Sequence, residues 1–143
     1  MLAAGTQALV IGAALSAAAA LAHIVCIPIG APAYRLMGAG EKMARAADAR
    51  KLRPTVITLG IAGVLFTWSL YALSGAGVIG HLPLVRLALP AIGAAYLGRA
   101  VAPPLLKPFF PENSRGFWLI SSGLCLVIGL VHIYGVVALW PML

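Results

Sequence analysis

Long runs of apolar residues, separated by short polar segments, dominate the sequence. Four of these runs approach or exceed the ~20 residues that a helix needs to cross the hydrocarbon core of a membrane. Prolines lie near the ends of the runs, where they are tolerated better than in a helix interior. The pattern predicts an all-α integral membrane protein, with four transmembrane helices packed as a small-residue-rich bundle over residues 7–30, 54–73, 84–101 and 117–140.

The third run is the least regular of the four. It is short, carries Arg86 and Arg99 near its two ends, and contains Pro90. A proline inside a helix removes one backbone hydrogen bond and predicts a kink. A re-entrant hairpin is the alternative interpretation, but a long basic side chain such as Arg99 can extend to the membrane interface. We therefore expect a full span.

The composition agrees with a chain that mostly faces lipid. Of the 143 residues, 62% are hydrophobic and only 9% are charged, with a mean hydropathy of +1.03, whereas soluble domains carry about 25% charged residues. Residues 9–22 resemble the apolar part of a secretory signal. No Lys or Arg precedes them, however, so we expect an uncleaved first span and a single membrane domain over residues 1–143.

The basic residues predict how the chain is oriented. They gather in two connections, residues 34–53 and 102–115 with the adjacent Arg99, whereas the connection between the second and third runs holds only Arg86. By the positive-inside rule the two basic connections are cytoplasmic, and both termini lie on the non-cytoplasmic side. Because the Ala, Gly and Arg richness suits a bacterium with a GC-rich genome, we expect the cell inner membrane.

The formal net charge of +7 raises the question of a nucleic-acid partner. The basic residues flank apolar runs, which is the placement expected of contacts with anionic lipid headgroups and not with nucleic acid. Glu41 precedes Arg45 by four residues, the favourable order for a helical ion pair. We expect a short basic helix, with the segment from Arg45 to Arg53 against the lipid bilayer, and a plain solvated loop is the alternative.

Small and hydroxyl-bearing residues recur at helical spacing in three of the runs. Because helices in a membrane pack through close approach of small side chains, we expect these stripes to face the bundle interior. Small residues on several faces also allow a homo-oligomer or a larger membrane complex. The stripes are Ser16, Ala20, His23, Cys26 or Ile27 and Gly30; then Gly60, Gly63, Thr67, Tyr71 and Ser74; and finally Ser121, Cys125, Gly129, His132 and Gly135.

Two histidines, His23 and His132, lie inside predicted spans, and a buried ionisable residue in a span is a candidate for function. Haem b ligation by the pair is disfavoured by their depths. Counted from the basic side, His23 is 12 residues from Arg35 and His132 is 17 from Arg115, an offset of roughly 7 Å along a helix. The chain has no metal-binding motif, and Cys26 and Cys125 form no paired motif. We predict no metal and no cofactor.

Catalytic candidates are few. His23, Tyr71, Arg99 and His132 supply the residue types of an acid, a base and an anion clamp, and they support a small membrane enzyme acting on a lipid-like or quinone-like substrate as the alternative function. All three acids, Glu41, Asp48 and Glu112, lie in the basic connections, so a transporter working as an oligomer would rest on histidine alone. The sequence favours instead an accessory subunit or a binder of a small apolar ligand, with each histidine stabilising the bundle.

Overall fold

The computed structural model describes all 143 residues, and its regular structure is entirely helical. The helices differ greatly in length. Four are long and form the body of the molecule, and the others are short and belong to the connections. In chain order they are α1 (Leu2–Ile29), α2 (Ala31–Leu36), α3 (Glu41–Asp48), α4 (Leu52–Gly75), α5 (Val85–Val101), α6 (Pro103–Leu106), the 3-10 helix η1 (Lys107–Phe109) and α7 (Arg115–Leu139).

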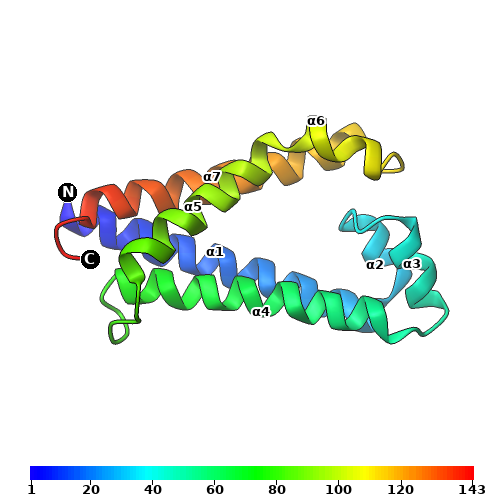
Figure 1. Cartoon of the computed structure of the whole chain (residues 1–143), viewed down its shortest axis with the longest axis horizontal. Coiled ribbons are helices and arrows are strands. Elements are labelled where there is room, and N and C mark those ends of the chain that lie inside the picture. The colour runs from blue at the N-terminus through cyan, green and yellow to red at the C-terminus, as the bar shows by residue number, and fades with distance from the viewer.

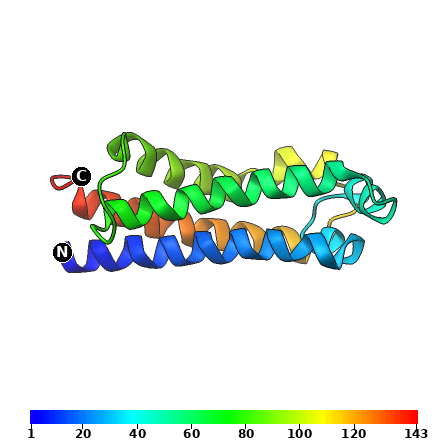
Figure 2. The same cartoon turned by 90° about the horizontal axis from the view of Figure 1, so that it is seen from below.

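The four long helices form two antiparallel pairs, α1 with α4 and α5 with α7 (Figures 1 and 2). The pairs are joined chiefly through α1 and α7, which also contact each other extensively. Both chain termini lie at one end of the molecule, which we call the terminal end, and α2, α3 and α6 lie at the other, which we call the basic end (Figure 1). The two pairs diverge toward the basic end (Figure 1).

Three of the predicted spans are confirmed as helices that are long and apolar enough to cross a membrane: α1, α4 and α7. The third predicted span corresponds to α5, whose residues pass the same test only together with the segment that follows, across a bend of 62°. The bend occurs at Pro103 and Pro104, which have no backbone N–H to continue the α5 hydrogen-bond pattern. Pro90, by contrast, lies within α5 without ending it.

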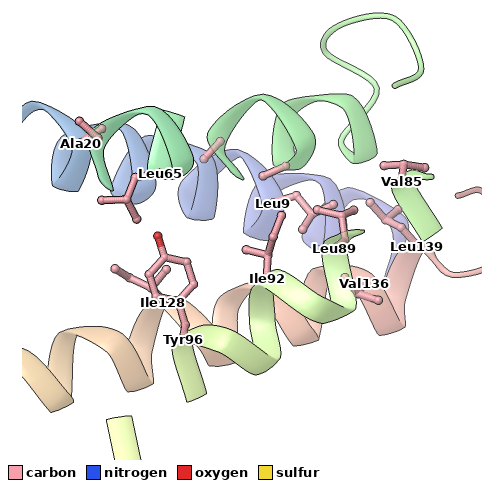
Figure 3. Close-up of a cluster of buried hydrophobic side chains, with 13 residues drawn as sticks. Leu9, Ala20, Leu65, Val85, Leu89, Ile92, Tyr96, Ile128, Val136 and Leu139 are labelled. Carbon is pink, nitrogen blue, oxygen red and sulfur yellow. The ribbon is translucent and has the colours of Figure 1, made fainter. Parts of the chain in front are cut away.

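The main hydrophobic core lies in the half of the molecule nearer the termini. It comprises 13 buried residues from all four long helices, including Leu9, Leu89, Ile92 and Val136 (Figure 3). On α1 this core ends at Ala20. A second cluster lies at the basic end, where α2 and α3 fold back beside α1, and it contains Cys26, Ala31, Ala33, Tyr34 and Ala44.

The two cysteines are in different parts of the structure. Cys26 belongs to the cluster at the basic end, whereas Cys125 packs against the main core. Both thiols are free. The two thiols therefore belong to different clusters, on α1 and α7, and the helix pairs that contain these helices diverge toward the basic end (Figure 1).

The inward-facing stripes predicted for α1 and α7 are largely confirmed. Ser16, Ala20, Gly129 and Gly135 are buried, and the glycines allow close approach. A Cβ atom added to Gly135 would lie 2.6 Å from Cγ of Leu9, and one added to Gly129 would lie 2.8 Å from Cδ2 of Leu97. Since real Cβ contacts are longer than this, these positions accept no side chain without rearrangement.

The stripe predicted for α4 is wrong in its first half. Gly60, Gly63 and Thr67 are exposed, and the space beside both glycines is empty. The inward face instead carries Thr58, Ala62, Leu65, Ser69 and Ala72. Both faces of α4 are apolar, so hydropathy could not decide between them. One specific contact that accompanies the observed orientation is the hydrogen bond that Ser69 Oγ donates to the Ala13 carbonyl at 2.8 Å.

The helix predicted for the first connection, over residues 41–53, is confirmed in part as α3, so a plain loop is wrong for Glu41–Asp48. It is not a basic helix, because α3 carries two acidic and two basic residues, and Arg50 and Lys51 follow it. The expected ion pair is also present, with Arg45 Nε 3.1 Å from Glu41 Oε1. Arg35 donates two further hydrogen bonds to the same carboxylate, each at 3.0 Å. The sequence did not predict α2. It begins after Gly30, whose φ of 80° ends α1 in a conformation that favours glycine.

The two basic connections contact each other, and we call this contact the clasp. The Glu41 backbone N–H donates to Glu112 Oε1 at 2.6 Å, and Asn113 Nδ2 donates to the Gly38 carbonyl at 3.1 Å. The Phe117 ring fills the space beside Gly38. The clasp therefore links the α2–α3 segment to the start of α7.

Candidate functional site

The most deeply buried ionisable side chain is His132 of α7, which is 0% exposed. Its Nδ1 lies 2.9 Å from the Ile128 carbonyl, one helical turn earlier. A carbonyl only accepts hydrogen bonds, so Nδ1 carries the hydrogen and Nε2 of the neutral ring carries a lone pair. This Nε2 is buried without a partner, and such an acceptor costs about 1–3 kcal/mol.

The His132 ring is part of a polar centre to which each long helix contributes one side chain. Tyr96 of α5 lies beside it, with ring centroids 5.5 Å apart. The Tyr96 hydroxyl is 2.9 Å from Ser16 Oγ of α1, and Trp68 of α4 packs edge-on against Tyr96 at 5.1 Å. Figure 3 shows the Tyr96 hydroxyl pointing away from α5 toward the α1–α4 pair. The polar centre therefore links all four long helices.

Two members of this centre, Trp68 and Tyr96, were not among the residues predicted from the sequence. Tyr96 follows Leu89 by seven residues and Gly93 by three, and all three are buried. That spacing puts them on one helical face, and a buried tyrosine usually needs a hydrogen-bond partner. The shared face of Leu89, Gly93 and Tyr96 is the signal in the sequence that points to Tyr96, and the charges and proline of the third run do not contain it.

The structure separates His23 from His132. His23 is partly buried, and its Nδ1 bonds the Ala19 carbonyl at 2.7 Å within its own helix. His132 contacts α1 at Gly12, which is eleven residues before His23, or roughly 16 Å along the helix. The two rings therefore lie at different levels of the molecule.

The other two candidates are also in separate surroundings. Tyr71 packs at the edge of the main core, and Arg99 lies near the start of α7, where its Cζ is 5.4 Å from the centre of the Trp118 ring. No hydrogen bond joins any two of His23, Tyr71, Arg99 and His132. The structure also contains no group of three or more His, Cys, Asp or Glu side chains placed to hold a metal ion.

A second site lies at the basic end, where the 62° bend carries α6 away from α5 and leaves a groove beside α7. We call this the basic groove. Its volume is about 360 Å³, which is within the usual range of ligand sites. It is lined by Ala100, Val101, Pro103, Pro104, Lys107, Arg115, Trp118, Leu119 and Ser122.

The basic groove combines positive charge with an apolar surface. Lys107 and Arg115 line it, and no acidic side chain does. Val101 and Leu119, which are 74% and 76% exposed, extend it onto the outer surface of the helices. Ser122 Oγ, in its wall, is buried without a hydrogen-bond partner.

Arg99 adds a third positive charge beside this groove. Its Nη2 donates to Ser121 Oγ at 3.4 Å, and its guanidinium lies over the Trp118 ring, which lines the groove. Nη1 of the same guanidinium is buried without a partner. Two polar atoms of this region, Nη1 of Arg99 and Oγ of Ser122, therefore have no hydrogen-bond partner within the protein.

Comparison with known proteins adds no assignment. The chain matches no family model, no curated protein and no solved structure. The residues of the polar centre and of the basic groove are therefore the basis for a functional proposal.

Proposed function

We propose that this chain is a non-catalytic multi-pass membrane protein that binds a small lipid-like amphiphile in the basic groove. The observation that carries the proposal is the lining of that groove, where exposed apolar side chains adjoin Lys107, Arg115 and the unpaired hydroxyl of Ser122. An amphiphile has the same two parts, an apolar chain and a polar head. The groove is also open to the outer surface of the helices, from which a lipid enters without crossing water.

The proposal places the protein in the cell inner membrane as a four-span bundle, with α5 crossing as the third span and α6 turning into the interface. The basic connections face the cytoplasm by the positive-inside rule, so the groove lies near the cytoplasmic headgroup level. Trp118 at this end and Trp140 at the other support that placement, because tryptophan is enriched at both interfaces. At the terminal end, the Cζ atom of Arg86 lies 5.8 Å from the centre of the Trp140 ring.

In this proposal the polar centre stabilises the bundle and does not bind the ligand. Interhelical hydrogen bonds in membranes contribute roughly 0.6–2 kcal/mol each, and the Ser16–Tyr96 bond is of this type. Neither the basic groove nor the groove beside Gln7 and Tyr134 is lined by Ser16, Tyr96 or His132. A centre that only holds the helices together suits an accessory subunit or a binding protein.

We favour binding over the enzyme and transporter alternatives for a geometric reason. An enzyme of this kind needs an acid, a base and an anion clamp around one substrate, and His23, Arg99 and His132 lie in different surroundings. Proton-coupled transport through histidine alone would need a connected path, and the two histidines are roughly 16 Å apart along the helix direction.

The proposal is tested by photo-crosslinking. The purified full chain in detergent is mixed with a phospholipid that carries a diazirine on one acyl chain, and labelled peptides are identified by mass spectrometry. We expect label on the peptides that contain Val101 and Leu119. Ser122→Phe, which fills the groove, should abolish it.

Gly123→Phe is the matched control, because Gly123 is the next residue and has open space beside it. It should retain the label. Equal labelling of the two variants, or labelling spread evenly over all outward-facing helices, would contradict binding in the groove.

The polar centre has a separate test that bears on haem. A visible absorption spectrum of the purified protein should lack a Soret band if His132 serves packing alone. A Soret band that disappears in His132→Ala would instead establish a haem ligand and replace the structural role that we propose for this residue.

A further inference from the structure

We infer that the head of the bound amphiphile is a net-anionic phospholipid headgroup, held by Lys107 and Arg115 through its phosphate. This inference rests on the proposed function, because it specifies the chemistry of the ligand in the same basic groove. It concerns which lipid is selected, whereas the proposed function concerns whether a lipid is bound at all.

The charge of the groove is the first argument. Lys107 and Arg115 line it, and no acidic side chain does. A third cation, the Arg99 guanidinium, lies over the ring of Trp118, which is itself a lining residue. The nearest acid in sequence, Glu112, accepts a hydrogen bond from the Glu41 N–H at the clasp and does not line the groove. A net-anionic ligand therefore meets an uncompensated positive field.

The unpaired hydroxyl of Ser122 is the second argument. Ser122 is one of the lining residues, and its Oγ is buried and has no hydrogen-bond partner in the protein. Most buried polar groups have a partner, and a hydroxyl can donate to a ligand oxygen. A phosphate supplies several strong acceptor oxygens, and Lys and Arg are the side chains that most often bind it.

The position of the groove is the third argument. Basic pockets between membrane helices at the cytoplasmic side are the places where anionic headgroups bind. The 62° bend at the end of α5 carries Lys107 sideways over the start of α7, where Arg115 lies. Val101 and Leu119 then leave an apolar surface along which acyl chains can run.

The arginines of α2 and α3 have acidic partners, whereas the basic side chains that line the groove have none there. Arg35 and Arg45 are already paired with Glu41, and Arg35 also lies 3.7 Å from Asp48. Lys51 is exposed and lies outside the groove. It therefore offers a matched control, with the same change of charge at the same end of the molecule.

The experiment uses native mass spectrometry of the full chain in detergent, with dioleoyl phosphatidylglycerol or dioleoyl phosphatidylcholine added. The two lipids share acyl chains, and only the first carries a net negative charge. We expect tighter binding of phosphatidylglycerol. Lys107→Gln and Arg115→Gln should each weaken it about fivefold, while Lys51→Gln should not.

The remaining outcomes separate the two proposals. Equal binding of both lipids, abolished by Ser122→Phe, would overturn the anionic headgroup and leave the groove as a lipid site. Loss of neither lipid in Ser122→Phe would overturn both. Inorganic phosphate alone is the last probe. If it protects the groove from photo-crosslinking or displaces phosphatidylglycerol, the ligand is the free ion and the lipid inference is wrong.

Discussion

Gly12 of α1 lies directly against the imidazole of His132, and a Cβ atom added to Gly12 would stand 2.7 Å from Cε1 and 2.9 Å from Nδ1 of that ring. The ring is fully buried and also packs beside Tyr96, so it has little room to move. The contact between α1 and α7 at this level therefore depends on the absence of a side chain at position 12.

Gly12→Ala should lower the free energy of unfolding by about 1–3 kcal/mol, because it overpacks a filled core. Unfolding in mixed detergent and SDS micelles measures this. Gly63→Ala is the control, since no atom lies within 4 Å of the added Cβ. Much of the penalty should disappear when His132→Ala is combined with Gly12→Ala, and purely additive effects would contradict the contact.

The hydrogen bond between Ser16 and Tyr96 provides a second test of the polar centre. Ser16→Ala and Tyr96→Phe should each cost roughly 0.6–2 kcal/mol of stability, as interhelical hydrogen bonds in membranes do. The double variant should cost less than the sum, because the two changes remove one shared interaction. Thr67→Val is the control, since Thr67 is exposed and bonds only the Gly63 carbonyl of its own helix.

The clasp should respond to acid. Hydrogen bonds from Arg35 and then from Arg45 hold the pKa of Glu41 at about 2, below its usual 4.5. The hydrogen bond from the Glu41 N–H likewise lowers the pKa of Glu112. Because folding lowers the pKa of Glu112, the stabilisation that its carboxylate gives the clasp is present above the usual carboxyl pKa of 4.5 and is lost on acidification below it. The pairs of Glu41 with Arg35 and Arg45, inside the α2–α3 segment, are lost only as the pH falls toward 2.

The distance between spin labels at Lys42→Cys and Phe109→Cys measures this response, with both native cysteines replaced by alanine. We expect a constant distance from neutral pH down to the usual range of a carboxyl group, followed by lengthening on further acidification. Glu112→Ala should lengthen it already at neutral pH. A clasp that stays closed in that variant would show that Asn113 and Phe117 suffice.

The orientation of the chain is tested by reporter fusions. A reporter that is active only in the cytoplasm should be inactive when joined after Leu143 and active when inserted after Ala49. The physical reason is that basic connections are retained on the cytoplasmic side. The reverse pattern would invert the topology and place the basic groove on the opposite face of the membrane.

The sequence by itself determined the long helices to within a few residues and indicated α3, whereas it did not predict α2 or α6. Long apolar runs locate α1, α4 and α7, because the helix is the simplest single-segment structure that satisfies its backbone in lipid. Glu41 with Arg45 located α3. Small residues at helical spacing also identified the inward faces of α1 and α7, and they did so because glycine and alanine allow helices to approach closely.

Only the tertiary structure decided which side chains meet. On α4 both faces are apolar, so the sequence could not place Ser69 rather than Gly63 in the interior, where Ser69 Oγ donates to the Ala13 carbonyl. Tyr96 and Ser16 are 80 residues apart. The position of each residue within its own helix does not predict that the two side chains meet. The basic groove depends on the 62° bend after α5. Periodicity within a single helix can indicate which face is buried, but it does not say which residue of another helix that face meets, because this depends on how the helices pack.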